Sequence, residues 1–132
     1  THSASPLAVA AALENIRILK AERLTERAAR LQRPLKAAVE EIGRKYAHRV
    51  GAVFCRGLVA GLLMVRPGTR DPDGDAALAI NETCFQKGLL MFAPVGLGGA
   101  CVKIAPPLTI DKEAIEEGCA VLEEAYAEVI GV

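Results

Sequence analysis

The sequence predicts an α+β domain in which helices cover a small, mainly antiparallel sheet of three to four strands. Two observations carry this prediction. Apolar residues recur every three or four positions near both ends of the chain, whereas the middle is rich in valine, leucine and glycine. A chain of 132 residues, 52% of them hydrophobic, is long enough for one core. We expect a long helical entry over residues 1–48 and the α+β domain proper over 49–132.

Composition excludes several classes of function. Sixteen basic and sixteen acidic residues give a formal net charge of zero, so no basic footprint for nucleic acid or an anionic membrane is present. No apolar run is long enough to span a bilayer, and we expect a soluble, cytoplasmic protein. Four widely spaced cysteines lack a C-x-x-C pair or a nearby histidine, which favours reduced thiols over a metal site.

The first helix is expected directly after the start of the chain. Ser5 and Pro6 are typical of an N-cap followed by proline at the first helical position, and the alanine-rich run 7–19 has high helix propensity. A solitary helix gains little from so many alanines, so we expect it to pack against another element, one absent from this chain. The start without a methionine also favours a piece cut from a longer protein.

Residues 22–48 carry the stripe of an amphipathic helix. Pro34 falls inside this pattern and removes one internal hydrogen bond, at a cost of about 3 kcal/mol, so we expect a kink or a break near residues 30–33. The expected stripe comprises Leu24, Ala28, Leu31, Leu35, Val39, Ile42 and Tyr46.

The middle of the chain predicts strands separated by turns. Residues 50–65 read as two strands with a bend or bulge, and 76–87 as a short helix closed by Gly88. Residues 89–95 are predicted as a third strand and 101–105 as a fourth, with a glycine turn between them. In the fourth strand Lys103 is a charge within an apolar segment, and Pro106 and Pro107 then turn the chain out of the sheet.

The last helix is expected to begin at Asp111, whose side chain can cap it. Glutamates occupy the face opposite its apolar stripe. The expected buried residues are Ile115, Cys119, Leu122, Tyr126 and Val129.

Two loops were candidates for binding, and each has a simpler interpretation. The carboxylates of residues 71–75, together with Glu82, partly match a calcium loop, but Ala76 stands where glycine is needed and Pro72 stiffens the start. A solvated acidic loop is favoured. Glycines in residues 96–99 could bind phosphate, but this loop opens a strand rather than a helix, so a hairpin loop is favoured.

No residue pattern predicts a self-sufficient active site. His2 and His48 are far apart in the sequence and have no obvious common catalytic partner. No serine or cysteine is followed or preceded by a base at a spacing typical of a nucleophilic enzyme. Taken alone, Lys103 is a lysine on a solvated strand face, although its charge could also meet a substrate carboxylate.

Four segments nevertheless form a pattern together: Thr1–Ala12, Gly57–Gly61, Lys87–Leu90, and Val102–Ile110 followed by an acidic helix. In this order they resemble the C-terminal part of the class III aminotransferases. These are pyridoxal-phosphate enzymes of fold type I that include the ornithine, acetylornithine and 4-aminobutyrate aminotransferases. The resemblance covers essentially the whole chain.

The resemblance implies roles for two residues. The threonine at the position of Thr1 hydrogen-bonds the cofactor phosphate of the other subunit of a homodimer. The position of Lys103 commonly holds an arginine that pairs with the substrate carboxylate. Lysine offers one compact charge in place of a planar fork, so amines, ω-amino acids or keto compounds become candidate substrates.

The chain departs from the family pattern elsewhere. Phe54 and Cys55 replace a common Arg-Gly, and His2 and Ser5 replace an aromatic residue and an asparagine. The Schiff-base lysine of the family lies upstream, on the large cofactor-binding domain, and none of the lysines here has its surroundings.

The leading hypothesis is therefore the small C-terminal domain of such an enzyme, which completes the substrate site and the dimer. We expect this chain to contain no catalytic residue, no metal site and no covalently bound cofactor, and to be inactive alone. A free-standing, non-catalytic α+β module that binds a ligand or a protein is the alternative.

Overall fold

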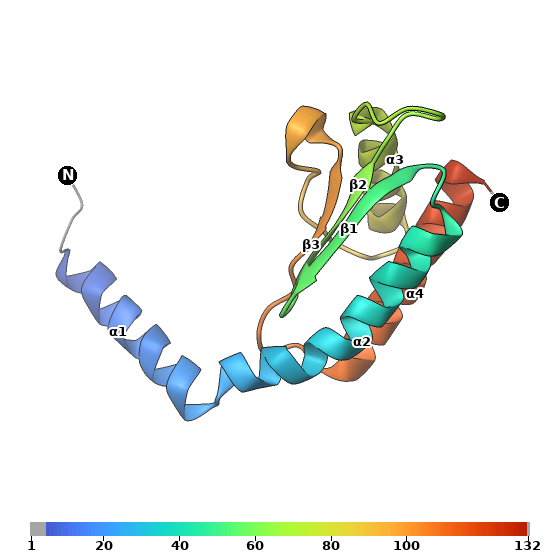
Figure 1. Ribbon diagram of the computed structural model, residues 1–132. Helices are drawn as coiled ribbons and strands as arrows, with labels where there is room; N and C mark the ends of the chain where they lie inside the picture. The colour runs from blue at the N-terminus through green and yellow to red at the C-terminus, as the bar shows by residue number, and fades with distance from the viewer. Residues whose placement is uncertain (1–4, 132) are drawn as a thin grey trace.

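The computed structural model describes residues 5–131 and shows the α+β architecture that the sequence predicts (Figure 1). Three strands form one antiparallel sheet in the order β1-β2-β3. The elements in chain order are α1 (Pro6–Ala21), α2 (Leu24–Lys45), β1 (Val50–Arg56), β2 (Val59–Met64), α3 (Gly74–Gln86), a 3-10 turn (Leu97–Gly99), β3 (Cys101–Ile104) and α4 (Lys112–Ile130).

The sheet has one covered face and one bare face. Strands β1 and β2 form a hairpin that turns at Gly57, with an irregularity in register beside Gly51, as the glycines predict. The alternation of side chains sends Leu62 and Val102 into the core. Helices α2, α3 and α4 lie on that side of the sheet (Figure 1). The other face carries no helix among residues 5–131.

The predicted strand over residues 89–95 is wrong, and the sheet has three strands where three to four were expected. Only Val95 pairs with β3, exchanging two hydrogen bonds with Cys101 at 2.9 and 3.0 Å. At its other end the segment is held at the end of α3, because the amide of Leu89 donates to the carbonyl of Cys84 at 2.8 Å. Residues 89–92 therefore do not pair with β3. A cavity separates them from the end of that strand.

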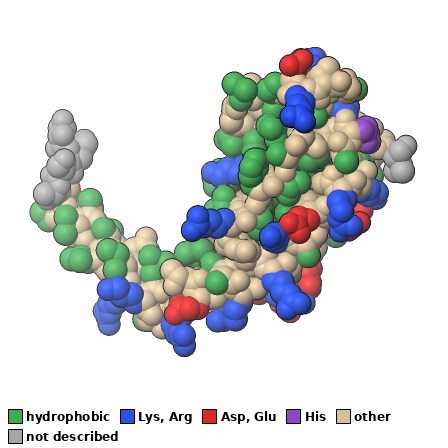
Figure 2. Space-filling model, viewed as in Figure 1, with side chains coloured by type: hydrophobic (Ala, Val, Ile, Leu, Met, Phe, Trp, Pro, Cys, Tyr) green, Lys and Arg blue, Asp and Glu red, His purple; other side chains and the backbone are tan. Residues whose placement is uncertain are grey.

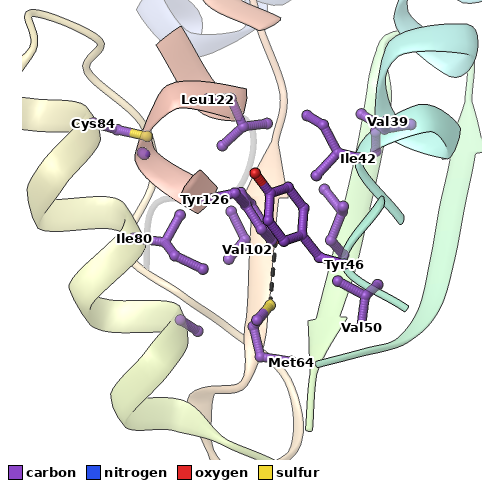
Figure 3. Close-up of a cluster of buried hydrophobic side chains, with 14 of the residues drawn as sticks. Val39, Ile42, Tyr46, Val50, Met64, Ile80, Cys84, Val102, Leu122 and Tyr126 are labelled. Carbon is purple, nitrogen blue, oxygen red and sulfur yellow. Dashed lines mark hydrogen bonds between the residues drawn. The ribbon is translucent and has the colours of Figure 1, made fainter. Parts of the chain in front are cut away.

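The core forms where α2 and α4 meet the sheet. Tyr46 and Tyr126 are both buried, with ring centroids 5.5 Å apart, and the Tyr126 hydroxyl lies 3.3 Å from the sulfur of Met64 (Figure 3). Both predicted helical stripes are confirmed as the faces that pack here. Their buried members in this core are Leu35, Val39, Ile42, Tyr46, Ile115, Leu122 and Tyr126.

Of the kink or break predicted near residues 30–33, the break is absent, because α2 continues through Pro34, but the helix bends along its length (Figure 1). Burial of the apolar stripe on both sides of the proline offsets the lost hydrogen bond. The helical segment is instead interrupted at Arg23, whose backbone is left-handed (φ 50°, ψ 46°). Glu22 and Arg23 together separate α1 from α2, and the left-handed backbone of Arg23 turns the chain between them (Figure 1).

Helix α1 leans away from the rest of the described chain (Figure 1). Ser5 occupies the N-cap position and Pro6 the first turn, as predicted, but the Ser5 side chain makes no capping hydrogen bond. None of the residues of α1 is buried, and hydrophobic side chains line its surface (Figure 2). Leu7, at 82%, is the most exposed of the large hydrophobic residues in the described chain.

The acidic loop before α3 is more than the solvated loop that the sequence favours. Asp73 is buried, and its carboxylate accepts a hydrogen bond from the Ala76 amide at 3.1 Å, which caps α3. Its second oxygen pairs with the guanidinium of Arg49 at 2.7 Å, and Arg49 also donates to the Val65 carbonyl. One carboxylate therefore joins the start of β1, the end of β2 and the start of α3.

Replacing Asp73 with alanine should be strongly destabilising. The change removes the cap of α3 and leaves the mostly buried guanidinium of Arg49 without its partner, so we expect a loss of about 2–4 kcal/mol in the free energy of unfolding. Urea unfolding followed by circular dichroism measures this loss. Asp71→Ala is the matched control, because Asp71 is exposed and its carboxylate forms no hydrogen bond or ion pair with another described residue, and it should change stability by less than about 0.5 kcal/mol. Equal stability of both variants would contradict the assignment.

Replacing Tyr46 with phenylalanine should leave stability unchanged or raise it by up to about 1 kcal/mol. The Tyr46 hydroxyl is buried and has no hydrogen-bond partner among the described residues. Burying it costs hydration free energy that no hydrogen bond returns, and the substitution removes this cost. Tyr126→Phe is the matched comparison, since it removes the contact with the Met64 sulfur and should cost about 0.5–1 kcal/mol. Thermal unfolding of the two variants tests the difference, and a destabilised Tyr46→Phe protein would contradict it.

Candidate functional site

Lys103 lies on the bare face of the sheet, as the alternation of β3 predicts. Its neighbours Val102 and Ile104 point into the core, and the register places Lys103 opposite Gly61 of β2, which is opposite Phe54 of β1. Gly61 has no side chain to cover the space between them. A Cβ atom at that position would lie 2.8 Å from the sulfur of Cys101, which is too close. A glycine is therefore favoured here, and no side chain covers the sheet beside Lys103.

The ammonium group of Lys103 is held over an aromatic ring rather than beside a carboxylate. Its Nζ lies 4.7 Å from the centroid of the Phe92 ring, a cation–π distance. Among residues 5–131 no acidic side chain forms an ion pair with Lys103, whereas Lys45 and Lys87 each pair with glutamates of α4. Lys103 is therefore a half-buried cation whose charge is available to an anion.

An open depression of about 590 Å³ surrounds this row of residues on the bare face and extends past β1 to α2. It combines exposed apolar side chains with basic ones, and hydrophobic and basic groups alternate on this side of the molecule (Figure 2). Such a mixture suits a small anion with an apolar part. The side chains that give it this character are Phe54, Arg56, Val59 and Lys103, whereas Lys36 at the other end is paired with Glu40.

The double proline after β3 forms the corner that the sequence predicts. Beyond Pro106, the amide of Ile110 closes a turn onto the carbonyl of Pro107 at 3.0 Å. The carboxylate of Asp111 then accepts a hydrogen bond from the Ala114 amide at 2.8 Å, which confirms the predicted cap of α4. The strand that carries Lys103 is thus fixed at both ends, by the ladder with β2 and by this corner.

Arg27 also holds this corner, a role that no local pattern in the sequence predicts. From the first turn of α2, its guanidinium donates to the carbonyls of Ile110 at 2.6 Å and Thr109 at 3.3 Å. The residues concerned are more than eighty positions apart, so only the fold brings them together. The one available signal was its position next to Ala28, at the edge of the apolar stripe of α2.

The four cysteines are free thiols, as predicted, and none is activated. Burial raises the pKa of Cys84 and of Cys119 to about 11, and burial also raises the pKa of Cys55 and of Cys101, the latter against a smaller opposing effect of Lys103. A raised pKa leaves little thiolate at neutral pH, so these thiols are poor nucleophiles. Among residues 5–131, no group of three or more potential ligand residues could hold a metal ion.

Three of the described lysines are poorly suited to covalent attachment of an aldehyde cofactor such as pyridoxal phosphate. A Schiff-base lysine is activated by a lowered pKa, but glutamate partners raise the pKa of Lys45, Lys87 and Lys112. Thr1, for which the family resemblance implies a phosphate contact, lies outside the described residues.

The remaining loop candidates have structural roles in the described chain. The glycines at 96, 98 and 99 form the turn between Val95 and Cys101, which confirms the hairpin-loop interpretation.

The described helices include none with the length and hydrophobicity needed to cross a bilayer.

Comparison with known proteins identifies the family. The family described as aminotransferase class III matches residues 1–126. The 5-aminovalerate aminotransferase of Pseudomonas putida is 31% identical over 129 residues, which cover 98% of this chain and 30% of that protein. The putrescine–pyruvate aminotransferase of Pseudomonas aeruginosa is 36% identical over 121 residues, which cover 89% of this chain and 25% of that protein.

Solved structures agree with this assignment. A transaminase from the marine bacterium Virgibacillus superposes with a TM-score of 0.81 at 27% identity, covering 98% of this chain and 30% of that one. A phospholyase from Arthrobacter in complex with phosphoethanolamine gives 0.82 at 28% identity, covering 92% and 29%. The chain spans less than a third of the length of these relatives. Its motifs, fold and family match together show that the chain belongs to the class III aminotransferases.

Proposed function

We propose that this chain is the C-terminal part of a pyridoxal-phosphate-dependent aminotransferase subunit. The complete subunit would move an amino group from an amine or amino acid to a 2-oxo acid. The observation that carries the proposal is the family match over residues 1–126, in a chain that spans only 25–30% of its aminotransferase relatives. The same match disfavours a free-standing binding module.

The cofactor would be held mainly by the part of the subunit that this chain does not span. Pyridoxal phosphate supplies the electron sink for amino transfer, and the protein supplies its binding and orientation. None of the lysines of this chain has the sequence surroundings that the family resemblance implies for the Schiff-base lysine, so we assign that residue to the remaining part. We assign Thr1 to the cofactor phosphate of the partner subunit, and the complete enzyme to a cytoplasmic homodimer. The family resemblance supports both, and the free thiols suit a reducing compartment.

We assign Lys103 to the carboxylate of the substrate. Its half-buried ammonium has no acidic partner among the described residues and faces the open side of the sheet beside Gly61. A lysine makes a weaker and less directional clamp than a bidentate arginine. The proposed donors are therefore amines and ω-amino acids in addition to α-amino acids.

We propose that residues 1–48 connect a large cofactor-binding domain to residues 49–132. The bare apolar surface of α1 supports this proposal, because a helix with no buried residue requires a partner to cover its leucines and isoleucines. Helix α2, by contrast, already packs against the sheet and α4. The large domain would cover α1.

The 132-residue chain alone should show no aminotransferase activity. The proposal assigns the Schiff-base lysine to another part of the subunit, so the chain mixed with pyridoxal phosphate, an amino donor and a 2-oxo acid should give no product above the rate of free cofactor. Coupled detection of the oxo acid measures this rate. Turnover that borohydride treatment abolishes would contradict the proposal, because borohydride traps an imine formed on the protein.

Substitutions of Lys103 in the complete subunit should separate donors by their carboxylate. Lys103→Ala should lower kcat/KM for a carboxylate-bearing donor such as 5-aminovalerate about 10-fold or more, and should leave that for a simple diamine within about twofold. Lys103→Arg should retain or improve use of the carboxylate donor. Lys36→Ala is the control, because Lys36 lies at the other end of the depression and pairs with Glu40. Identical kinetics for both donors in all variants would return Lys103 to a purely structural role.

A further inference from the structure

The described chain contains a large apolar cavity that meets the candidate substrate site only at Lys103 and Phe92. It has a volume of about 560 Å³ and lies between residues 89–92, the end of β3 with its corner, and the first half of α4. On the α4 side the cavity is lined by two small residues, Ala114 and Gly118, whose side chains do not fill it. A Cβ atom at Gly118 would lie 3.4 Å from a methyl group of Leu89. The cavity exists because residues 89–92 do not pair with β3.

The walls of this cavity are unsuited to polar metabolites. Its lining is aliphatic or aromatic except for Lys103 at the rim and the thiol of Cys119, whose raised pKa keeps it neutral. An amine or a 2-oxo acid buried here would lose its hydration without hydrogen bonds in return. Apolar side chains, however, would gain free energy on entering it.

The rim of the cavity exposes hydrophobic residues to an unusual degree. Leu90 is 80% exposed and Phe92 is 56% exposed, and together they continue the apolar lining out to the surface. Exposed patches of this kind mark surfaces that another polypeptide covers. The relatives are more than three times as long as the part of them that this chain matches, so most of the subunit is available to do so.

We propose that the cavity between residues 89–92 and α4 is a docking site for an apolar segment of the remaining part of the same subunit. This inference rests on the proposed function, because it requires a longer aminotransferase subunit. It adds a second contact, separate from the bare surface of α1, through which residues 49–132 would be held in place. The segment would cover Leu90 and place hydrophobic side chains against Ala114 and Gly118, at the end of the cavity away from Lys103.

Thiol labelling at the rim tests the proposal. In Leu90→Cys, maleimide should modify residue 90 rapidly in the 132-residue chain and at least about 10-fold more slowly in the complete subunit, with the modified peptide identified by mass spectrometry. Thr69→Cys, in the exposed loop before α3, is the labelling control and should react at similar rates in both. Equal reactivity of residue 90 in the chain and in the complete subunit would overturn the proposal.

A second pair of variants tests the cavity itself. Ala114→Trp should fill the cavity and lower the thermal midpoint of the complete subunit by about 3 °C or more, while leaving that of the 132-residue chain unchanged. Ala120→Trp, exposed on the same helix and outside the cavity, should change neither midpoint. An unchanged midpoint of the complete Ala114→Trp subunit would overturn docking.

Two further measurements identify which idea fails. If residue 90 stays reactive in the complete subunit but 4-phenylbutyrate protects it, the cavity binds small apolar carboxylates and the docking proposal is wrong. Aminotransferase activity of the unsubstituted complete subunit is measured alongside. Its absence would refute the proposed function, whereas its presence with a reactive residue 90 would refute only the docking inference.

Discussion

The contact between Tyr46 of α2 and Tyr126 of α4 is the point on which the rest of the structure depends. The two buried rings lie 5.5 Å apart, and Tyr126 reaches the sulfur of Met64 in β2. Two helices and the central strand are thereby held together at one place (Figure 3). Aromatic rings of this size contribute a large share of core free energy, and their burial compensates for the proline inside α2.

This one-sided core has a consequence for function. Because all three packed helices lie on the same side of the sheet, the opposite face stays open, and the alternation of β3 places Lys103 on it. Because Gly61 has no side chain, the surface beside the ammonium group of Lys103 stays uncovered. Arg27 and the double proline fix the corner that follows β3, so the charged strand is held at both ends. A rigid strand is a more accurate support for a binding group than a mobile loop.

The bare surfaces of the molecule agree with the short span of the chain relative to its relatives. Helix α1 buries no residue, and the cavity beside α4 opens through an exposed leucine and an exposed phenylalanine. A stable isolated domain seldom leaves such areas uncovered. Both areas lie outside the core around Tyr46, so this core forms without their being covered.

Much of this architecture was determined by the sequence alone, because the signals were local. Helical stripes, the helix start at Pro6, the cap at Asp111 and the outward position of Lys103 each depend on residues a few positions apart. Local signals were insufficient where two alternatives cost similar free energy. The apolar run 89–95 has the composition of a strand, yet its anchorage to α3 at Leu89 prevents pairing, and Pro34 breaks isolated helices but not one whose stripe is buried on both sides. Only the tertiary structure could bring Arg27 to Ile110, and Arg49 to the buried carboxylate of Asp73, because such pairs form across long sequence separations and are decided by packing.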